Sequence, residues 1–166
     1  MGMYKVTGFV ATVITFVSYT VSFSAPFWYY IDLGTREIYG GLWQSCLSNF
    51  ITRTCSNNVL TSNPGWIHVY QTFGCLALIC VISCLILMIL YMFIWKQDER
   101  LRKAIISAAF ASAGMIFLCV TIFAAKFRDK DYQKEDLSFS FYLTFVAILT
   151  SLWTGVILIV GNMKGD

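Results

Sequence analysis

Charged residues are scarce in this chain, and their scarcity is the first guide to its class. Asp, Glu, Lys and Arg make up 13% of the 166 residues, whereas charged residues form about a quarter of an ordinary soluble domain. Hydrophobic residues make up 58%. So few charges cannot cover the surface of a water-soluble domain of this size, and the sequence therefore predicts a membrane protein.

The residues that catalysis and metal binding need are also missing. His68 is the only histidine, which excludes a histidine-based metal site, and no Cys-x-x-Cys pair exists for thiol–disulfide chemistry. Cys80 and Cys84 are one helical turn apart in an apolar run, where cysteine packs as a small hydrophobic residue. A glycine-rich phosphate loop and a basic nucleic-acid patch are absent, because the cations at 96–103 form an ordinary linker. We therefore expect no enzyme, cofactor, metal or nucleic-acid partner.

Charge is absent altogether from four long stretches, residues 6–25, 69–95, 104–125 and 139–160. About 20 apolar residues cross a hydrocarbon core roughly 30 Å thick, so each stretch can span a membrane. Because the backbone must satisfy its own hydrogen bonds in lipid, all four are expected to be helices. The predicted fold is an all-α membrane protein, a left-handed four-helix transmembrane bundle forming one domain over residues 1–166. Ionisable residues mark transport pathways in membranes, so their absence argues against a transporter.

The first and third spans each allow a second interpretation. Lys5 before an apolar run is typical of a secretory signal, but this run is too long and ends in a bulky cluster at 26–29. The third span carries small residues at helical spacing: Ala104, Ser107, Ala108, Ala109, Ala111, Ser112, Ala113 and Gly114. Small residues let helix backbones approach closely, so this span is predicted to be the central packing element. A contact with a partner subunit is the alternative.

The distribution of cations leaves the orientation open. Loops 26–68 and 126–138 together carry six Lys and Arg residues, and the termini with the second loop also carry six. The enrichment of cations in cytoplasmic loops therefore gives no decision. Disulfides persist in oxidising compartments, and Cys46 and Cys55 are the only cysteines outside the spans. If they are bridged, both loops are extracellular and both termini are cytoplasmic. The alternative is a pair of free thiols in a cytosolic loop.

The loop at 26–68 is predicted to form a small antiparallel β-sheet. Short strand-like runs separated by Gly, Asn and Ser occur at 27–33, 36–39, 42–47 and 49–55. The spacing of Cys46 and Cys55 suits a hairpin in which they face each other on neighbouring strands. A loop of about 43 residues has little core, so a disulfide and buried Trp28 and Trp43 would stabilise it. The stretch 62–66 indicates a helix start ahead of the second span.

One motif in this loop is typical of a known family. Trp28 is followed by Gly41-Leu42-Trp43-x2-Cys46-x8-Cys55. Together with four spans and a smaller loop at 126–138, this motif resembles the claudin and peripheral myelin protein superfamily. Within it the chain is most similar to the peripheral myelin and epithelial membrane protein branch, or to a claudin-like invertebrate relative. The resemblance implies that Trp28, Gly41, Leu42 and Trp43 are structural residues of the family motif.

The chain departs from typical claudins in three ways. The tail at 161–166 ends in an acidic residue, so we expect no PDZ scaffold to bind it. No Asn-x-Ser/Thr sequon exists, so the N-glycosylation found in some relatives is not expected here. The first-loop charges balance, since Asp32 and Glu37 oppose Arg36 and Arg53, which disfavours an ion-selective pore.

The resemblance implies a structural, adhesive four-span protein of the plasma membrane that organises cell–cell contacts as a junction or barrier component. Its partners would be the lipid bilayer and itself or related four-span proteins, in the same or the opposing membrane. The alternative is an accessory subunit or membrane organiser of a channel or receptor. The candidate contact residues, apolar or aromatic and near the loop tips, are Phe50, Ile51, Phe127 and Tyr132. Phe50 and Ile51 could instead pack beneath the sheet or dip into the headgroups.

Overall fold

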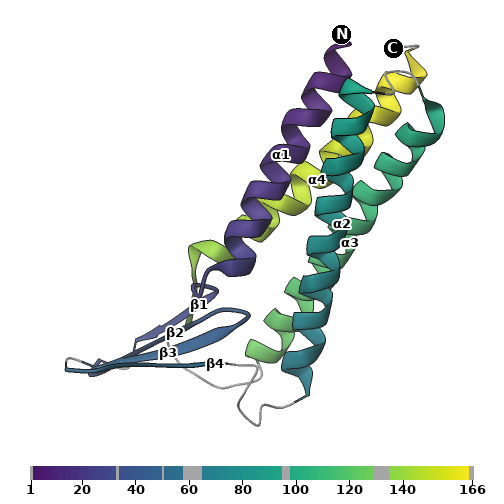
Figure 1. Cartoon of the computed structure of the whole chain (residues 1–166). Helices are drawn as coiled ribbons and strands as arrows, with labels where there is room; N and C mark the ends of the chain where they lie inside the picture. The colour runs from purple at the N-terminus through teal and green to yellow at the C-terminus, as the bar shows by residue number, and fades with distance from the viewer. Residues whose placement is uncertain are drawn as a thin grey trace.

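The molecule is a bundle of four helices with a small sheet at one end (Figure 1). The computed structural model describes residues 2–32, 34–49, 51–57, 65–94, 98–128 and 135–164. The helices are α1 (Met3–Ser24), α2 (Trp66–Phe93), α3 (Glu99–Arg128) and α4 (Phe139–Met163). All four are long and apolar enough to cross a membrane, and both termini lie at the end opposite the sheet (Figure 1). The predicted four-span fold is confirmed.

All four helices extend beyond the spans predicted for them at one end or both, and α2 and α3 are the longest. α3 covers 30 residues and α2 covers 28, which correspond to about 45 Å and 42 Å of helix. Both exceed a hydrocarbon core of roughly 30 Å. Charged residues limit the part of a helix that lies in lipid, but they do not end the helix itself. α3 therefore begins at Glu99, before its uncharged stretch. The Asp98 carboxylate caps this start by accepting the Arg100 backbone N–H at 2.8 Å. At the other end α2 and α3 reach past α1 and α4, beside the sheet (Figure 1).

Hydroxyl groups and small residues line the helix contacts in the middle of the bundle. Three pairs of side-chain oxygens meet between helices: Thr15–Thr150 at 2.7 Å, Thr12–Thr154 at 3.4 Å and Ser112–Ser151 at 2.7 Å. We call these three pairs the hydroxyl seam. They fit together closely enough to leave no room for a water molecule. The small residues of α3 divide between two faces, since Ala109 and Ala113 are buried whereas Ala111 and Gly114 are exposed.

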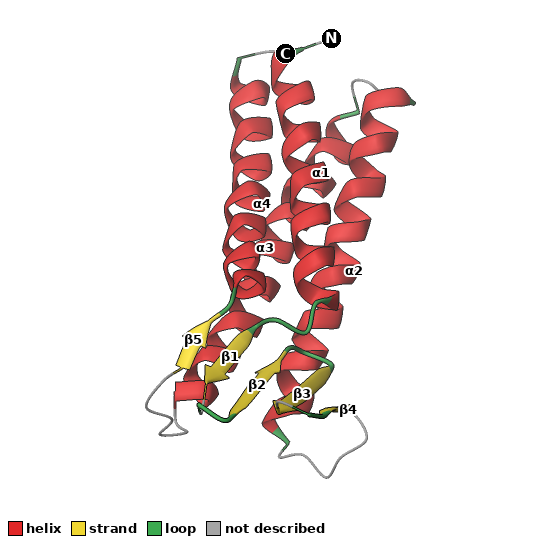
Figure 2. Ribbon diagram, turned by 90° about the vertical axis from the view of Figure 1, so that its left-hand side faces the viewer, coloured by secondary structure: helices red, strands yellow, loops and turns green. Residues whose placement is uncertain are grey.

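The sheet is antiparallel and draws on both loops at its end of the bundle (Figure 2). Its strands are β1 (Tyr29–Asp32), β2 (Arg36–Gly40), β3 (Gln44–Asn49), β4 (Arg53–Asn57) and β5 (Glu135–Leu137), in the order β4-β3-β2-β1-β5. Gly34 joins β1 to β2 with a φ of +78°, a conformation that suits glycine. Because β1 pairs with β5, the second loop is fixed to the first.

The strands differ from the predicted ones where side chains leave the sheet to pack on the bundle. Trp28 precedes β1 and Leu42 precedes β3, although both were expected within strands. Both are fully buried among the helices, and that packing removes them from the strand path. Asn49 ends β3, and Ile51 and Thr52 lie in the turn before β4. β5 was not predicted, because its three residues form a strand only through pairing with β1.

Candidate functional site

The two tryptophans of the motif bind the end of α1 that faces the sheet. A helix leaves its last four carbonyl groups without partners inside the helix. The indole N–H of Trp28 donates to the Ser22 carbonyl oxygen at 2.8 Å, and that of Trp43 donates to the Phe23 carbonyl oxygen at 3.0 Å. The loop therefore caps the helix that precedes it, and the hydrogen bonds fix where the sheet begins.

Trp28 also joins the sheet to α3 and α4. Its side chain is 0% exposed, and its ring packs edge-to-face on Phe123 of α3 with centroids 5.0 Å apart. Its backbone N–H donates to the Gly40 carbonyl oxygen at 2.7 Å, and its own carbonyl accepts from the Ser138 N–H at 3.1 Å. One residue therefore contacts α1, β2, α3 and the start of α4.

The residues between β2 and β3 attach the sheet to α1 and α2. Gly41 has no room for a side chain, since a Cβ atom there would lie 2.5 Å from the Ala25 carbonyl oxygen. Leu42 is fully buried, and its carbonyl accepts a 2.7 Å hydrogen bond from the side-chain amide of Gln71 on α2. Its methyl group lies against Gly74, where a Cβ would approach it to 2.9 Å. A side chain at position 41 or at position 74 would therefore collide with its neighbours, and Leu42 fills the space between them.

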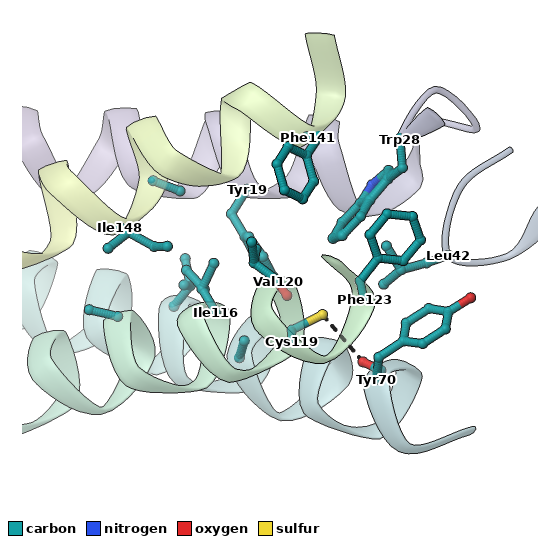
Figure 3. Close-up of a cluster of buried hydrophobic side chains, with 14 of the residues drawn as sticks. Tyr19, Trp28, Leu42, Tyr70, Ile116, Cys119, Val120, Phe123, Phe141 and Ile148 are labelled. Carbon is teal, nitrogen blue, oxygen red and sulfur yellow. Dashed lines mark hydrogen bonds between the residues drawn. The ribbon is translucent and has the colours of Figure 1, made fainter. Parts of the chain in front are cut away.

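An aromatic cluster lies where these contacts meet, at the sheet end of the bundle (Figure 3). It comprises Trp28, Tyr70, Phe123 and Phe141, with Leu42 beside them. Tyr70 packs edge-to-face on Phe123 at 5.7 Å. Phe123 and Tyr70 were not identified from the sequence. Their only signal is a position near the ends of uncharged runs, which is equally typical of aromatic residues at a lipid–water interface.

The disulfide joins the two outermost strands on the β4 side. Cys46 of β3 and Cys55 of β4 are directly opposed and bridged, with Cα atoms 4.1 Å apart. Cys46 is buried and Cys55 is exposed, as is every other residue of β4. The predicted disulfide is confirmed. The four remaining cysteines are unbridged and lie in helices: Cys75, Cys80, Cys84 and Cys119.

The candidate contact residues are only partly within the described structure. Ile51 lies in the turn between β3 and β4 and is 93% exposed. Phe127 lies near the end of α3, and its side chain is outside the described part. Phe50 and Tyr132 are outside the described residues altogether. Ile51 is thus the one member of this set with a known environment, and it does not pack beneath the sheet.

The sheet surface carries charges of both signs. Its exposed ionisable side chains include Asp32, Arg36, Glu37 and Arg53. The Arg53 guanidinium lies 5.1 Å from the ring centroid of Tyr39, and a hydrogen bond to the Glu37 carboxylate raises the pKa of Tyr30. Within the described ranges, no three His, Cys, Asp or Glu side chains come together as a metal site. The surface therefore offers mixed polar contacts around an apolar tip.

A family model agrees with this architecture. The model of the PMP-22/EMP/MP20/Claudin family matches residues 1–158, which covers the four helices and both loops apart from the end of α4. A search among curated proteins found no match.

Proposed function

The chain belongs to the PMP-22/EMP/MP20/Claudin family, and on that premise we propose that it is a structural, adhesive four-span protein that organises cell–cell contacts. The sheet lies outside the cell, and both termini lie in the cytoplasm of a plasma-membrane protein. Its partners are copies of itself or related four-span proteins. Junction or barrier formation follows from contacts made by the sheet.

The observation that supports this proposal best is an exposed apolar side chain, Ile51, at the tip of a sheet whose base is buried among the helices. Ile51 is 93% exposed, whereas Trp28 and Leu42 at the base of the sheet are 0% exposed. The disulfide lies between these two regions and closes the hairpin that ends in Ile51. An apolar side chain presented by a preorganised loop loses little conformational freedom on binding. The balanced charges of the sheet would form the polar rim of such a contact.

The interior of the bundle favours an adhesive role over an ion pathway. Among the described residues, the buried polar groups are uncharged: they include Ser and Thr hydroxyls, the amide of Gln71, the hydroxyl of Tyr19 and the indole N–H of Trp28. The hydroxyl seam has no space for water. Selectivity filters and transport pathways use carbonyl rings or ionisable side chains around a hydrated passage.

The proposal is tested with the full-length protein in polarised epithelial cells. We expect Ile51→Ser to lower cell–cell adhesion and transepithelial resistance while the surface level stays normal. Thr54→Ser, on the exposed strand β4, is the matched control and leaves both unchanged. A second variant also changes Phe50, Phe127 and Tyr132 to Ser. Unchanged adhesion and resistance in both variants contradict the contact assignment, and a strong charge-selective conductance contradicts the barrier role.

One observation favours the alternative of an accessory subunit for a channel or receptor. Trp153 is 57% exposed on α4, near the middle of a helix of 25 residues. Tryptophan usually lies at the membrane interfaces rather than at the centre. A helix of a partner protein would cover it. Co-purification of one channel or receptor that is lost in Trp153→Leu, with localisation away from cell borders, would favour this function over adhesion.

A further inference from the structure

The net charge of the chain lies entirely at the end of the bundle that holds the termini. The segments 1–5, 94–103 and 161–166 contain six cations and three anions, a net charge of +3. The loops at 26–68 and 126–138 contain six of each and are neutral. The excess of positive charge is therefore concentrated at one membrane surface.

Part of this charge converges on one cleft between the helices. The cleft is narrow, with a volume of about 10 Å³ that holds about one water molecule. It is lined by Tyr4, Lys5, Tyr91, Arg102, Leu158, Gly161 and Asn162, contributed by all four helices. The Lys5 ammonium lies 5.0 Å from the ring centroid of Tyr91, a side chain that is 1% exposed. The Arg102 guanidinium donates to the side-chain oxygen of Asn162, and its side chain is only 12% exposed. Two cations from different helices are thus held in place at the same opening.

A third cation borders the cleft. The Lys164 ammonium lies 5.6 Å from the ring centroid of Tyr4, and a hydrogen bond to the hydroxyl of that tyrosine raises the pKa of Lys164. Contact with an aromatic ring positions an ammonium without neutralising it. Among the described residues at this end, the carboxylates are Asp98 and Glu99, both exposed. Glu99 lies 3.6 Å from Arg102, but it is 68% exposed and its pairing is screened by solvent.

These cations lie at the depth of lipid phosphates. Lys5 immediately precedes the uncharged stretch of α1, Arg102 lies two residues before that of α3, and Lys164 follows the end of α4. Long cationic side chains at helix ends extend into the headgroup layer. We propose that the phosphate of an anionic phospholipid binds over the mouth of this cleft, with Lys5, Arg102 and Lys164 as its charged ligands and Tyr4 as a hydroxyl donor. The bound lipid would tie α1, α3 and α4 together at this surface.

The experiment uses the full-length protein in mild detergent, with phosphatidylserine or phosphatidylcholine of the same acyl chains added. Native mass spectrometry counts bound lipid, and thermal unfolding reports its effect on stability, since a ligand that binds the native state raises the melting temperature. We expect phosphatidylserine to bind and stabilise more than phosphatidylcholine. Lys5→Gln and Lys164→Gln should each weaken that binding roughly fivefold, the effect of removing one cation near an anionic lipid. Arg102→Gln should weaken it by about tenfold or more, because a guanidinium binds phosphate through two parallel hydrogen bonds.

Two controls separate a cleft from diffuse attraction. Arg100→Gln removes a charge from the same end but outside the cleft, and Arg36→Gln removes one from the sheet. Arg100→Gln should weaken binding less than any of the three cleft variants does, and Arg36→Gln, at the opposite end of the molecule, should change it by less than about twofold. Equal binding of both lipids, or an Arg100→Gln effect as large as that of Lys164→Gln, overturns the proposal. Equal stabilisation by inorganic phosphate at the same concentration overturns the assignment to a lipid. Because micelles have no sides, the outcome does not depend on the orientation proposed above, which only decides the leaflet.

Discussion

The sheet end of the molecule and the middle of the bundle are held together by different interactions. At the sheet end, Trp28 and its aromatic neighbours are buried at the junction of α1, α3 and α4, and a disulfide closes the hairpin above them. In the middle, buried apolar side chains such as Ile116 and Ile148 pack beside small residues and the three hydroxyl pairs of the seam. At the sheet end one residue, Trp28, joins several elements, whereas in the middle the hydrogen bonds between helices are spread over three pairs of hydroxyl groups.

The difference follows from the solvent at each depth. The loops meet water, so burying aromatic surface there gains the full hydrophobic effect. In the hydrocarbon core, a helix gains nothing by exchanging lipid tails for apolar side chains, and association depends on close packing and interhelical hydrogen bonds. Single substitutions should therefore have large effects at the sheet end and small ones in the seam.

The largest effect is expected at Trp28. We expect Trp28→Ala to lower the free energy of unfolding by about 3–5 kcal/mol, because it removes a fully buried side chain and leaves the Ser22 carbonyl without its partner. Denaturant unfolding in detergent micelles measures this change. Trp153→Ala is the matched control, since it removes the same side chain from an exposed position on α4. If Trp28→Ala and Trp153→Ala lower the free energy of unfolding equally, the special role of Trp28 at the sheet end is contradicted.

Trp28→Phe separates the contribution of the indole hydrogen bond from that of aromatic packing. It keeps an aromatic ring in the cluster and removes the indole N–H that Ser22 accepts. We expect a loss of about 1–3 kcal/mol from the unsatisfied buried carbonyl. A loss as large as that of the alanine variant would mean that the hydrogen bond, rather than the aromatic packing, holds the sheet to α1.

The second effect in size is expected at the disulfide. Cys46→Ser with Cys55→Ser should cost about 2.5 kcal/mol, the chain-entropy value for a bridge between residues nine positions apart. The protein should also be retained in the secretory pathway, which surface biotinylation would measure. Cys80→Ser, at an unbridged half-buried cysteine of α2, is the control and should reach the surface normally. Unreduced protein with two free thiols at Cys46 and Cys55 would contradict both the bridge and the proposed orientation.

The sequence predicts the parts of this fold that depend on local pattern. The four helices follow from uncharged length, and the opposition of Cys46 to Cys55 follows from their spacing within strand-like runs. The parts that depend on tertiary contacts were missed or displaced. β5 has no strand pattern and exists through β1, and Leu42 leaves the strand path because Gln71 and Gly74 accommodate it on α2. Aromatic neighbours such as Phe123 could not be identified, because the same residues also suit a lipid interface.

The smallest effect is expected in the hydroxyl seam. A small effect there is what the contrast between the sheet end and the middle of the bundle requires. Thr15→Val keeps the shape of the side chain and removes the hydroxyl that lies 2.7 Å from that of Thr150. We expect a loss of about 0.6 kcal/mol and at most about 1.7 kcal/mol, the range measured for hydrogen bonds between helices in a membrane. Thr121→Val is the control, because within the described structure that hydroxyl donates to carbonyls of its own helix, at 2.9 Å and 3.0 Å.

A double-mutant cycle with Thr150→Val isolates the pair from the bonds that each threonine makes within its helix. A coupling energy near 0.6 kcal/mol would show that the seam stabilises the bundle by many weak pairs. A coupling energy of about 3 kcal/mol or more would place the seam level with Trp28, and the contrast between the two regions would then be wrong. The hydroxyls would in that case be as important to the fold as the aromatic cluster, even though lipid rather than water surrounds them.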